Sequence, residues 1–88
     1  MRRYQKDPAV YSRTDKDISY VLKSGGTHLF ELNETATLLW DMLKKPHTQV
    51  DLEKKLCSVF KISQEIASVD VSNFLTSCLR EHLLQEVK

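Results

Sequence analysis

Hydrophobic and polar residues alternate along Thr27–Leu32, and this segment runs without a linker into a second pattern with helical spacing. Alternation that uses aromatic and branched side chains is typical of a half-buried β-strand. Asn33 follows with the short polar side chain preferred at a helix N-cap, and Glu34 puts a negative charge in the first turn, where the helix dipole favours it. The hydrophobic residues of the expected helix then recur at i, i+3, i+4 and i+7, namely Ala36, Leu39, Trp40 and Leu43.

Two further strands are expected before this segment. Ala9–Arg13 and Ile18–Lys23 are short strand candidates, and polar turn residues separate them. Ser24–Gly26 follows as a hairpin turn whose glycines can take positive φ. The residues ahead of the first strand, Met1–Pro8, are polar and are expected to be loosely held and flexible.

The expected strand register follows if Ser24–Gly26 forms the hairpin loop. The opposing pairs are then Leu22 with His28, Tyr20 with Phe30, and Ile18 with Leu32, and the turn between the first two strands places Tyr11 opposite Tyr20. These residues share one face, which is mostly apolar, so the sequence predicts that this face lies on the core. Val21 and Leu29 are the apolar exceptions on the opposite face, and Leu29 is either an isolated exposed side chain or a ligand contact.

Three helices are expected after the strands. Pro46 ends the first helix at Lys45, because the residue before a proline is disfavoured in helical geometry. Thr48 caps a second helix, Gln49–Phe60, and Ser63 caps a third, about Gln64–His82, with Leu83–Val87 as a short extended end. The expected core positions of these two helices are Leu52, Leu56, Val59, Phe60, Ala67, Val71, Phe74, Leu75, Cys78, Leu79 and Leu83.

The order of elements predicts an α+β fold of winged helix-turn-helix type, with a three-stranded antiparallel sheet followed by three helices. At 88 residues the chain is expected to form one domain, residues 1–88, with 41 % hydrophobic and 28 % charged residues. No apolar run follows Arg2 and Arg3, and no stretch approaches the ~20 residues of a membrane span, so we expect a cytoplasmic protein.

No pattern in the sequence indicates catalysis or a cofactor. The chain lacks a phosphate-binding loop, a nucleophile motif and any metal-ligand spacing, so no catalytic residue, metal or cofactor is expected. The two cysteines, Cys57 and Cys78, lie at hydrophobic positions of expected helices and are interpreted as buried thiols. Glu31 and Glu34 flank the strand–helix junction, where a surface charge and a helix-start charge explain them.

Nucleic-acid binding is an alternative hypothesis that the winged-helix plan raises. The net charge is only +1, and the third helix carries Glu65, Asp70 and Glu81 against Arg80. Phosphate would repel this helix, so we expect neither nucleic-acid nor membrane-surface binding.

An extended peptide fits the expected sheet better. The second strand is central, and the first is protected by Pro8 and Arg13, whereas the third strand has a single charge, Glu31. A peptide could therefore add to the third strand, with its inward side chains between that strand and the third helix. Phe74, Leu75 and Cys78 would line this groove, with Val71 near its mouth. The alternative is an edge covered by a loop or by a second copy in a dimer.

Two runs of residues resemble the PqqD-like family. Leu32–Ala36 with Trp40 resembles its LNxTAxxxW signature, and Asp70–Leu75 with Leu79 resembles its later DVxxFLxxL pattern. The resemblance extends over about Val10–Leu84. Where the family usually has glycine before its final Leu-Leu pair, this chain has His82.

The resemblance implies a recognition element for ribosomally made, modified peptides, of the free-standing kind found in lasso-peptide antibiotic biosynthesis. Such domains act as peptide chaperones: they bind the leader of a precursor as an added strand and present it to a leader peptidase, a cyclase or another modifying enzyme. Carried over to this chain, the binding strand is Thr27–Glu31, comprising Thr27, His28, Leu29, Phe30 and Glu31. The helix face is Val71, Phe74, Leu75 and Cys78. We expect a monomer or weak dimer.

Overall fold

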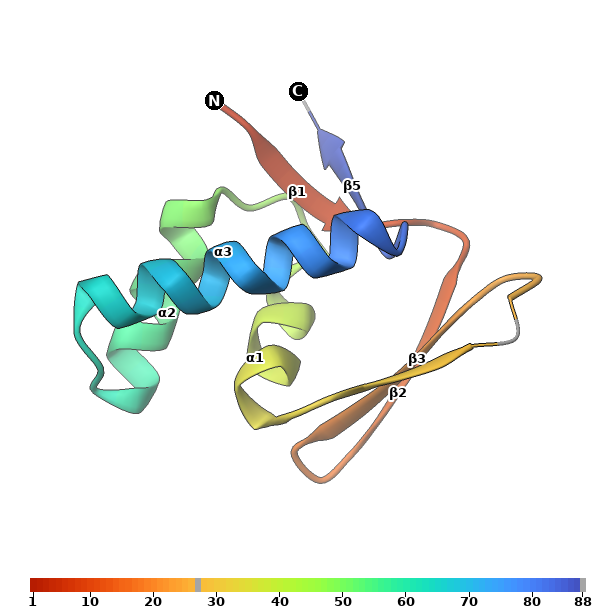
Figure 1. Cartoon of the computed structure of the whole chain (residues 1–88), viewed down its shortest axis with the longest axis horizontal. Coiled ribbons are helices and arrows are strands. Elements are labelled where there is room, and N and C mark those ends of the chain that lie inside the picture. The colour runs from red at the N-terminus through yellow and green to blue at the C-terminus, as the bar shows by residue number, and fades with distance from the viewer. Residues whose placement is uncertain (27, 88) are drawn as a thin grey trace.

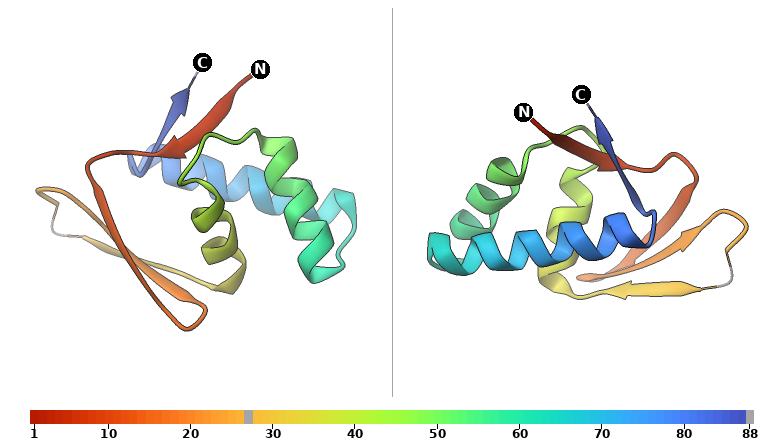
Figure 2. Two further views of the ribbon diagram at one scale, coloured as in Figure 1. Left: turned by 180° about the vertical axis from the view of Figure 1, so that it is seen from behind. Right: turned by 45° about the horizontal axis from the view of Figure 1, so that its top comes forward.

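The computed structural model describes residues 1–26 and 28–87 of the chain. Its elements in chain order are β1 (Arg3–Lys6), β2 (Val10–Asp15), β3 (Ile18–Lys23), β4 (Leu29–Leu32), α1 (Glu34–Met42), α2 (Gln49–Phe60), α3 (Gln64–Arg80) and β5 (Leu84–Val87). Strands β2, β3 and β4 form an antiparallel sheet. The long helix α3 starts beside α2 and runs past α1, and its C-terminal end lies near the sheet (Figures 1 and 2). The predicted α+β plan is confirmed. No helix among residues 1–26 and 28–87 combines the length and the hydrophobicity of a membrane span.

A second sheet of two strands joins the ends of the described chain. Strand β1 pairs antiparallel with β5, which is the extended segment expected near Leu83–Val87 (Figure 2). The Tyr4 amide also donates to the His47 carbonyl at 2.8 Å, and the Tyr4 side chain is buried. Within Met1–Pro8, which was expected to be loosely held, Arg3–Lys6 therefore forms a paired strand instead. This segment has no hydrophobic periodicity of its own, and it gains its order from backbone bonds to distant parts of the chain.

The three-stranded sheet pairs in a different register from the predicted one. Val21 lies opposite Phe30 and Ser19 opposite Leu32, one residue away from the expected pairs. A slip of one residue turns every side chain of a strand to the other face. Ser19 and Val21, both 0 % exposed, therefore face the core, and Tyr20 does not.

The connection between β3 and β4 explains the slip. The Gly26 amide donates to the Lys23 carbonyl at 2.8 Å, with Gly25 at φ 78°. Extending the observed pairing toward the turn puts Lys23 opposite His28, so the connection is one residue longer than the three-residue loop assumed from the sequence. The β2–β3 pairing differs too, since Arg13 rather than Tyr11 lies opposite Tyr20.

The helix starts follow the sequence closely. The Asn33 side chain accepts a bond from the Ala36 amide at 2.9 Å, and Thr48 forms a reciprocal capping box with Asp51. The backbone amide of Thr48 lowers the pKa of the Asp51 carboxyl by bonding its charged form. Ser63 caps α3 as predicted. The first helix ends at Met42 rather than Lys45, because the chain turns toward β1 and the Leu43 carbonyl accepts the Lys6 amide at 2.9 Å.

The end of α3 has a left-handed residue that is not glycine. His82 has φ 59°, the His82 amide donates to the Leu79 carbonyl, and the Leu83 amide donates to the Cys78 carbonyl at 2.9 Å. These two bonds are the Schellman pattern, which usually has glycine at the left-handed position. The helix thus ends at Arg80, two residues before the predicted boundary, and reverses sharply into β5.

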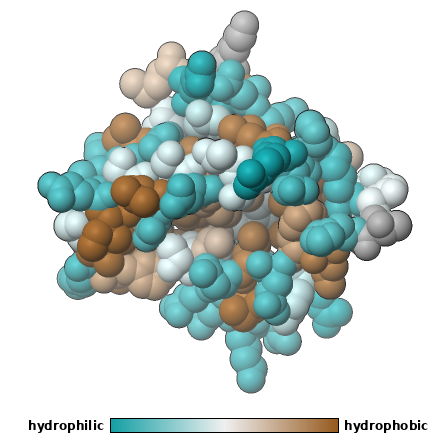
Figure 3. Space-filling model, in the orientation of Figure 1, coloured by the Kyte–Doolittle hydropathy of each residue, from teal (hydrophilic) through white to brown (hydrophobic). Residues whose placement is uncertain are grey.

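The core lies between the helices and the inner face of the sheet. Trp40, Leu43 and Leu52 are 0 % exposed, and Lys6 lies 4.6 Å above the Trp40 ring. Burial lowers the pKa of the Lys6 ammonium. Val59, expected in the core, is instead 47 % exposed. Val59, Ile66 and Val69 are exposed hydrophobic residues near the turn between α2 and α3. Figure 3 shows a strongly hydrophobic patch on this side of the molecule, at the left.

Candidate functional site

The outer edge of β4 is open. Among the described residues β4 pairs only with β3, while the C-terminal strand pairs with β1 and leaves this edge uncovered. Leu29 is 60 % exposed. The first requirement for strand addition, a row of unpaired backbone groups, is therefore met.

The hydrogen-bond pattern shows which groups of β4 face that edge. The Ser24 amide donates to the Ala9 carbonyl at 2.6 Å, so these two residues form a hydrogen-bonded pair between β2 and β3. Such pairs alternate along an antiparallel ladder, and the N–H and C=O groups of successive residues point to opposite sides. When this alternation is continued through the β2–β3 and β3–β4 pairings, Phe30 and Leu32 bond toward β3, and Leu29 and Glu31 direct their backbone groups outward.

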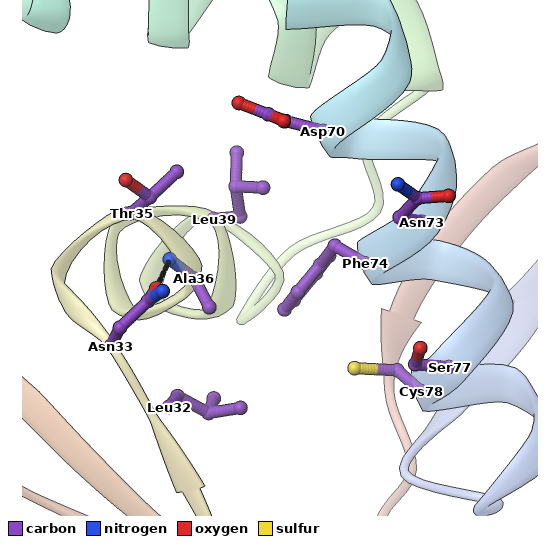
Figure 4. A pocket seen from close by; sticks show the side chains of 10 residues that line it. All are labelled: Leu32, Asn33, Thr35, Ala36, Leu39, Asp70, Asn73, Phe74, Ser77 and Cys78. Atoms are coloured by element: carbon purple, nitrogen blue, oxygen red, sulfur yellow. Dashed lines mark hydrogen bonds between the residues drawn. The ribbon is translucent and has the colours of Figure 1, made fainter.

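A groove runs beside this edge, between the β4–α1 junction and α3. Its first part has a volume of about 380 Å³, within the range of small-ligand pockets. Phe74 and Cys78 point from α3 toward Leu32 and Ala36 across this space (Figure 4). Leu39, which is 1 % exposed, belongs to its apolar lining, so the groove reaches the hydrophobic core. The complete lining is Leu32, Asn33, Thr35, Ala36, Leu39, Asp70, Asn73, Phe74, Ser77 and Cys78.

The groove continues along β4 as a second hollow of about 210 Å³. Its lining comprises His28, Leu29, Phe30, Glu31, Leu32, Ser77, Cys78, Glu81 and Leu83. Both parts share Leu32, Ser77 and Cys78, which therefore mark the joint between them. The His28 and Phe30 rings contact each other with centroids 4.5 Å apart. Together the two hollows follow β4 along its length and α3 over its second half.

The structure brings most of the predicted site residues together. His28, Leu29, Phe30 and Glu31 line the second hollow, Phe74 the first and Cys78 both. Val71 and Leu75, at 0 % and 3 % exposed, are core residues behind this surface and line neither hollow. Thr27 lies outside the described residues.

Sequence reasoning missed the polar side of the groove. Asp70, Asn73, Ser77 and Glu81 follow one another on the groove-facing side of α3 at spacings of three and four residues. The same spacing that predicts the hydrophobic stripe also identifies them, since they lie on the flank of Phe74 and Cys78. Only the apolar members of this surface were singled out.

The Cys78 thiol of the groove is a weak nucleophile at neutral pH. Burial raises the pKa of the Cys78 thiol to about 12, so the reactive thiolate is scarce at neutral pH. Both cysteines are free, with Cys78 buried and Cys57 partly buried. Within the described residues no group of three or more His, Cys, Asp or Glu side chains is arranged to hold a metal ion.

Comparison with known families identifies the chain. The family described as Coenzyme PQQ synthesis protein D (PqqD) matches residues 19–84, which is most of the sequence. The chain belongs to the PqqD family. The matched range includes the whole of β4 and α3, and therefore both sides of the groove.

Two solved structures share the fold of this PqqD-family chain. One is described as TbiB1 in complex with the TbiA(beta) leader peptide; it is 18 % identical with a TM-score of 0.84, over 92 % of this chain and 94 % of that chain. The other is lasso peptide synthetase B1 complexed with the leader peptide, 20 % identical with a TM-score of 0.81, over 93 % of this chain and 96 % of that one. At these identities the likeness shows a common fold. No curated protein matches the sequence.

Proposed function

We propose that this PqqD-family chain is a non-catalytic adaptor for a ribosomally synthesised precursor peptide. It binds the leader segment as a strand added to β4 and presents it to a leader peptidase, a cyclase or another modifying enzyme. The observation that carries the proposal is the open β4 edge beside a groove with an apolar lining. Two proteins of the same fold, both described as complexes with leader peptides, support it and favour the lasso-peptide kind of pathway.

Strand addition uses the two sets of groups that the site offers. The outward N–H and C=O groups of Leu29 and Glu31 bond to the backbone of the guest, which gives affinity without regard to its sequence. Side chains of the guest alternate between two faces. Those on the inner face, beside Phe30 and Leu32, enter the groove against Phe74 and give selectivity.

The proposed binding residues are therefore of two kinds. Thr27, His28, Leu29, Phe30 and Glu31 form the receiving strand, and Phe74 and Cys78 contact the guest from α3. Val71 and Leu75 act from the core by holding the groove-facing side of α3 in place, because their own side chains are buried.

The energetics agree with a carrier that must also release its cargo. A leader that is disordered when free loses conformational entropy when it docks, which offsets part of the contact energy. The groove is short, so we expect an interface near or below ~800 Å² per partner. While the leader is bound, the attached core peptide is held at a high effective concentration beside the processing enzyme. No catalytic group is needed on the adaptor for this role.

The proposal is tested by blocking the groove without disturbing the core. Ser77 is exposed and lines both hollows, so Ser77→Trp fills their joint. Thr76→Trp adds the same bulk to the neighbouring exposed position, which lines neither hollow. The probes are fluorescein-labelled N-terminal segments of the short reading frames that neighbour the gene, followed by fluorescence anisotropy.

We expect at least one segment to bind the wild type and Thr76→Trp alike, and Ser77→Trp to abolish that binding with an unchanged melting temperature. Binding that Ser77→Trp leaves intact would place the peptide elsewhere, and binding of none of the segments would contradict the adaptor role.

The same open edge also favours a second candidate, pairing of β4 with β4 of another copy. Exposed strand edges are templates for such association. Sedimentation of the peptide-free protein separates the two uses. A dimer that the added peptide dissociates means that both compete for one edge, whereas a dimer that persists with peptide bound lies on another surface.

A further inference from the structure

The groove has an acidic border that the peptide-binding role alone does not require. Asp70 lines the first hollow, and Glu81 lines the second. Both residues are exposed, and neither takes part in a salt bridge among the described residues. Within the described parts of the chain, no lysine or arginine lines either hollow.

The basic side chains beside Glu81, Lys23 and Arg80, do not offset its charge within the groove. Lys23 donates to the His82 carbonyl at 2.5 Å and lies 3.6 Å from the Asp7 carboxylate, so it is already engaged. Arg80 is in the last turn of α3 but lines neither hollow. A chain with net charge +1 thus has a binding groove whose charged lining is negative.

Helix stability does not explain where these carboxylates lie. Glu81 is the C-cap residue of α3, where the helix dipole disfavours a negative charge. Asp70 lies in the interior of the same helix, where aspartate is a poor helix former. Both positions favour a different residue on stability grounds, so the two carboxylates are better explained by what the groove binds.

A third carboxylate lies on the receiving strand itself. Glu31 directs its backbone groups to the open edge, so a guest residue can lie directly opposite it. The side chains of such a pair share one face, about 5 Å apart at their Cβ atoms, and opposite charges there stabilise the pairing. Arg13 lies on the same face of the sheet, but β3 lies between β2 and β4 and separates Arg13 from Glu31.

The spacing of the two helix carboxylates, Asp70 and Glu81, sets the length of peptide that would extend from one to the other. Glu81 follows Asp70 by eleven residues, which is about 16 Å along an α-helix. An extended strand covers that distance in about five residues. The joint at Leu32, Ser77 and Cys78 lies between the two ends, next to Phe74 in the first hollow.

We infer that the segment recognised by this groove is basic at its ends and apolar in its middle: an extended stretch with a lysine or arginine toward each of Asp70 and Glu81, about five residues apart, and a hydrophobic side chain in the joint between them. This inference rests on the proposed peptide-binding function and adds the chemical class of peptide that the site selects.

The experiment is selection from a random twelve-residue peptide library displayed on phage. It is run on immobilised wild type, on the double variant Asp70→Asn with Glu81→Gln, and on Glu65→Gln. Glu65 is an exposed carboxylate in the first turn of the same helix and lines neither hollow, so it controls for general loss of charge. Selected peptides are then synthesised and measured by anisotropy at low and high salt.

We expect the wild type and Glu65→Gln to enrich peptides with a hydrophobic residue between two basic ones, and the double variant to keep the hydrophobic residue and lose the basic residues at the two ends. For a selected peptide the double variant should weaken binding by about fivefold, as two partly exposed ion pairs imply. High salt should weaken wild-type binding by a similar factor and leave the double variant unchanged.

Enrichment of neutral or acidic peptides by the wild type, or unchanged basic enrichment on the double variant, would overturn this inference and leave the peptide-binding function standing. No enrichment above the bare support on any of the three proteins would contradict peptide binding itself, and the inference with it.

Discussion

Replacing Leu29 by proline is the sharpest test of strand addition. Leu29 lies on β4 with its backbone groups directed at the open edge, and its side chain is 60 % exposed. Proline removes the N–H that a guest strand would bond, and an edge strand tolerates proline when the missing donor faces outward. The fold therefore loses no sheet hydrogen bond, while the guest loses one.

The chain offers a closely matched control. Ser12 lies on β2, at the opposite edge of the same sheet, and the alternation that directs Leu29 outward also directs the Ser12 groups outward. Ser12 is exposed as well. Ser12→Pro thus removes an equivalent donor from the edge that no groove accompanies.

The expected magnitude follows from one backbone bond. A typical hydrogen bond contributes about 0.5–1.5 kcal/mol net, and an acceptor left without a partner in a partly dry groove costs about 1–3 kcal/mol. Leu29→Pro should therefore weaken leader binding by about 5- to 150-fold. Ser12→Pro should change it by less than about twofold.

Fluorescence anisotropy with a labelled leader segment measures both affinities, and circular dichroism confirms that each variant is folded. Equal affinities of two folded variants would refute strand addition on β4. A loss with Ser12→Pro alone would assign the guest to the β2 edge.

Three further predictions concern α3 and its ends. Phe74→Ala should weaken leader binding by about tenfold, because its ring lines the first hollow; a lower melting temperature with unchanged affinity would make Phe74 a core residue only. His82→Gly should stabilise the fold by about 1 kcal/mol, raising the melting temperature by about 4–8 °C, since glycine adopts positive φ without strain; no increase in thermal unfolding experiments would count against the left-handed helix end. Iodoacetamide at pH 8 should label Cys57 well before Cys78, because a pKa of about 12 leaves about one Cys78 thiol in 10⁴ ionised. Mass spectrometry after timed quenching follows the two sites, and faster labelling of Cys78 would contradict its burial.

Local signals in the sequence predicted the helices well. Asn33, Thr48 and Ser63 each cap the helix that they were expected to begin, and Gln49–Phe60 has the predicted bounds. The hydrogen bonds of a helix cap join residues within four positions of each other, so they can be predicted from the sequence without knowledge of the fold. The open β4 edge and the groove-lining roles of Phe74 and Cys78 also followed from element order and helical spacing.

The errors concern features that distant contacts determine. The predicted register of β3 was wrong by one residue because the loop after it is one residue longer than assumed. The hydrophobic pattern favoured the wrong register, because Tyr20 and Leu22 are more typical of a core than the buried Ser19. The buried Ser19 hydroxyl is satisfied by Thr14 at 2.8 Å, a partner that only the observed pairing supplies. Strand β1 has no pattern of its own, and its order depends on β5 at the other end of the chain.

Val71 and Leu75 show a related limit for the site. Helical spacing places them beside Phe74 and Cys78, but it cannot say which side of a two-sided helix meets the core. Asp70 and Glu81 served in the sequence analysis as an argument against DNA binding, although the same helical positions bring them to the groove.

The pairing of β1 with β5 has a mechanical consequence. Arg3 lies opposite Val87, so both ends of the described chain leave the same end of an antiparallel pair (Figure 1). Force applied between the two ends would open that pair like a zipper, one rung after another, rather than shear all rungs together. Among the described residues, the sheet that carries β4 shares no ladder with these strands, so we expect the half of the molecule that contains the groove to withstand a pull that has already separated the two ends.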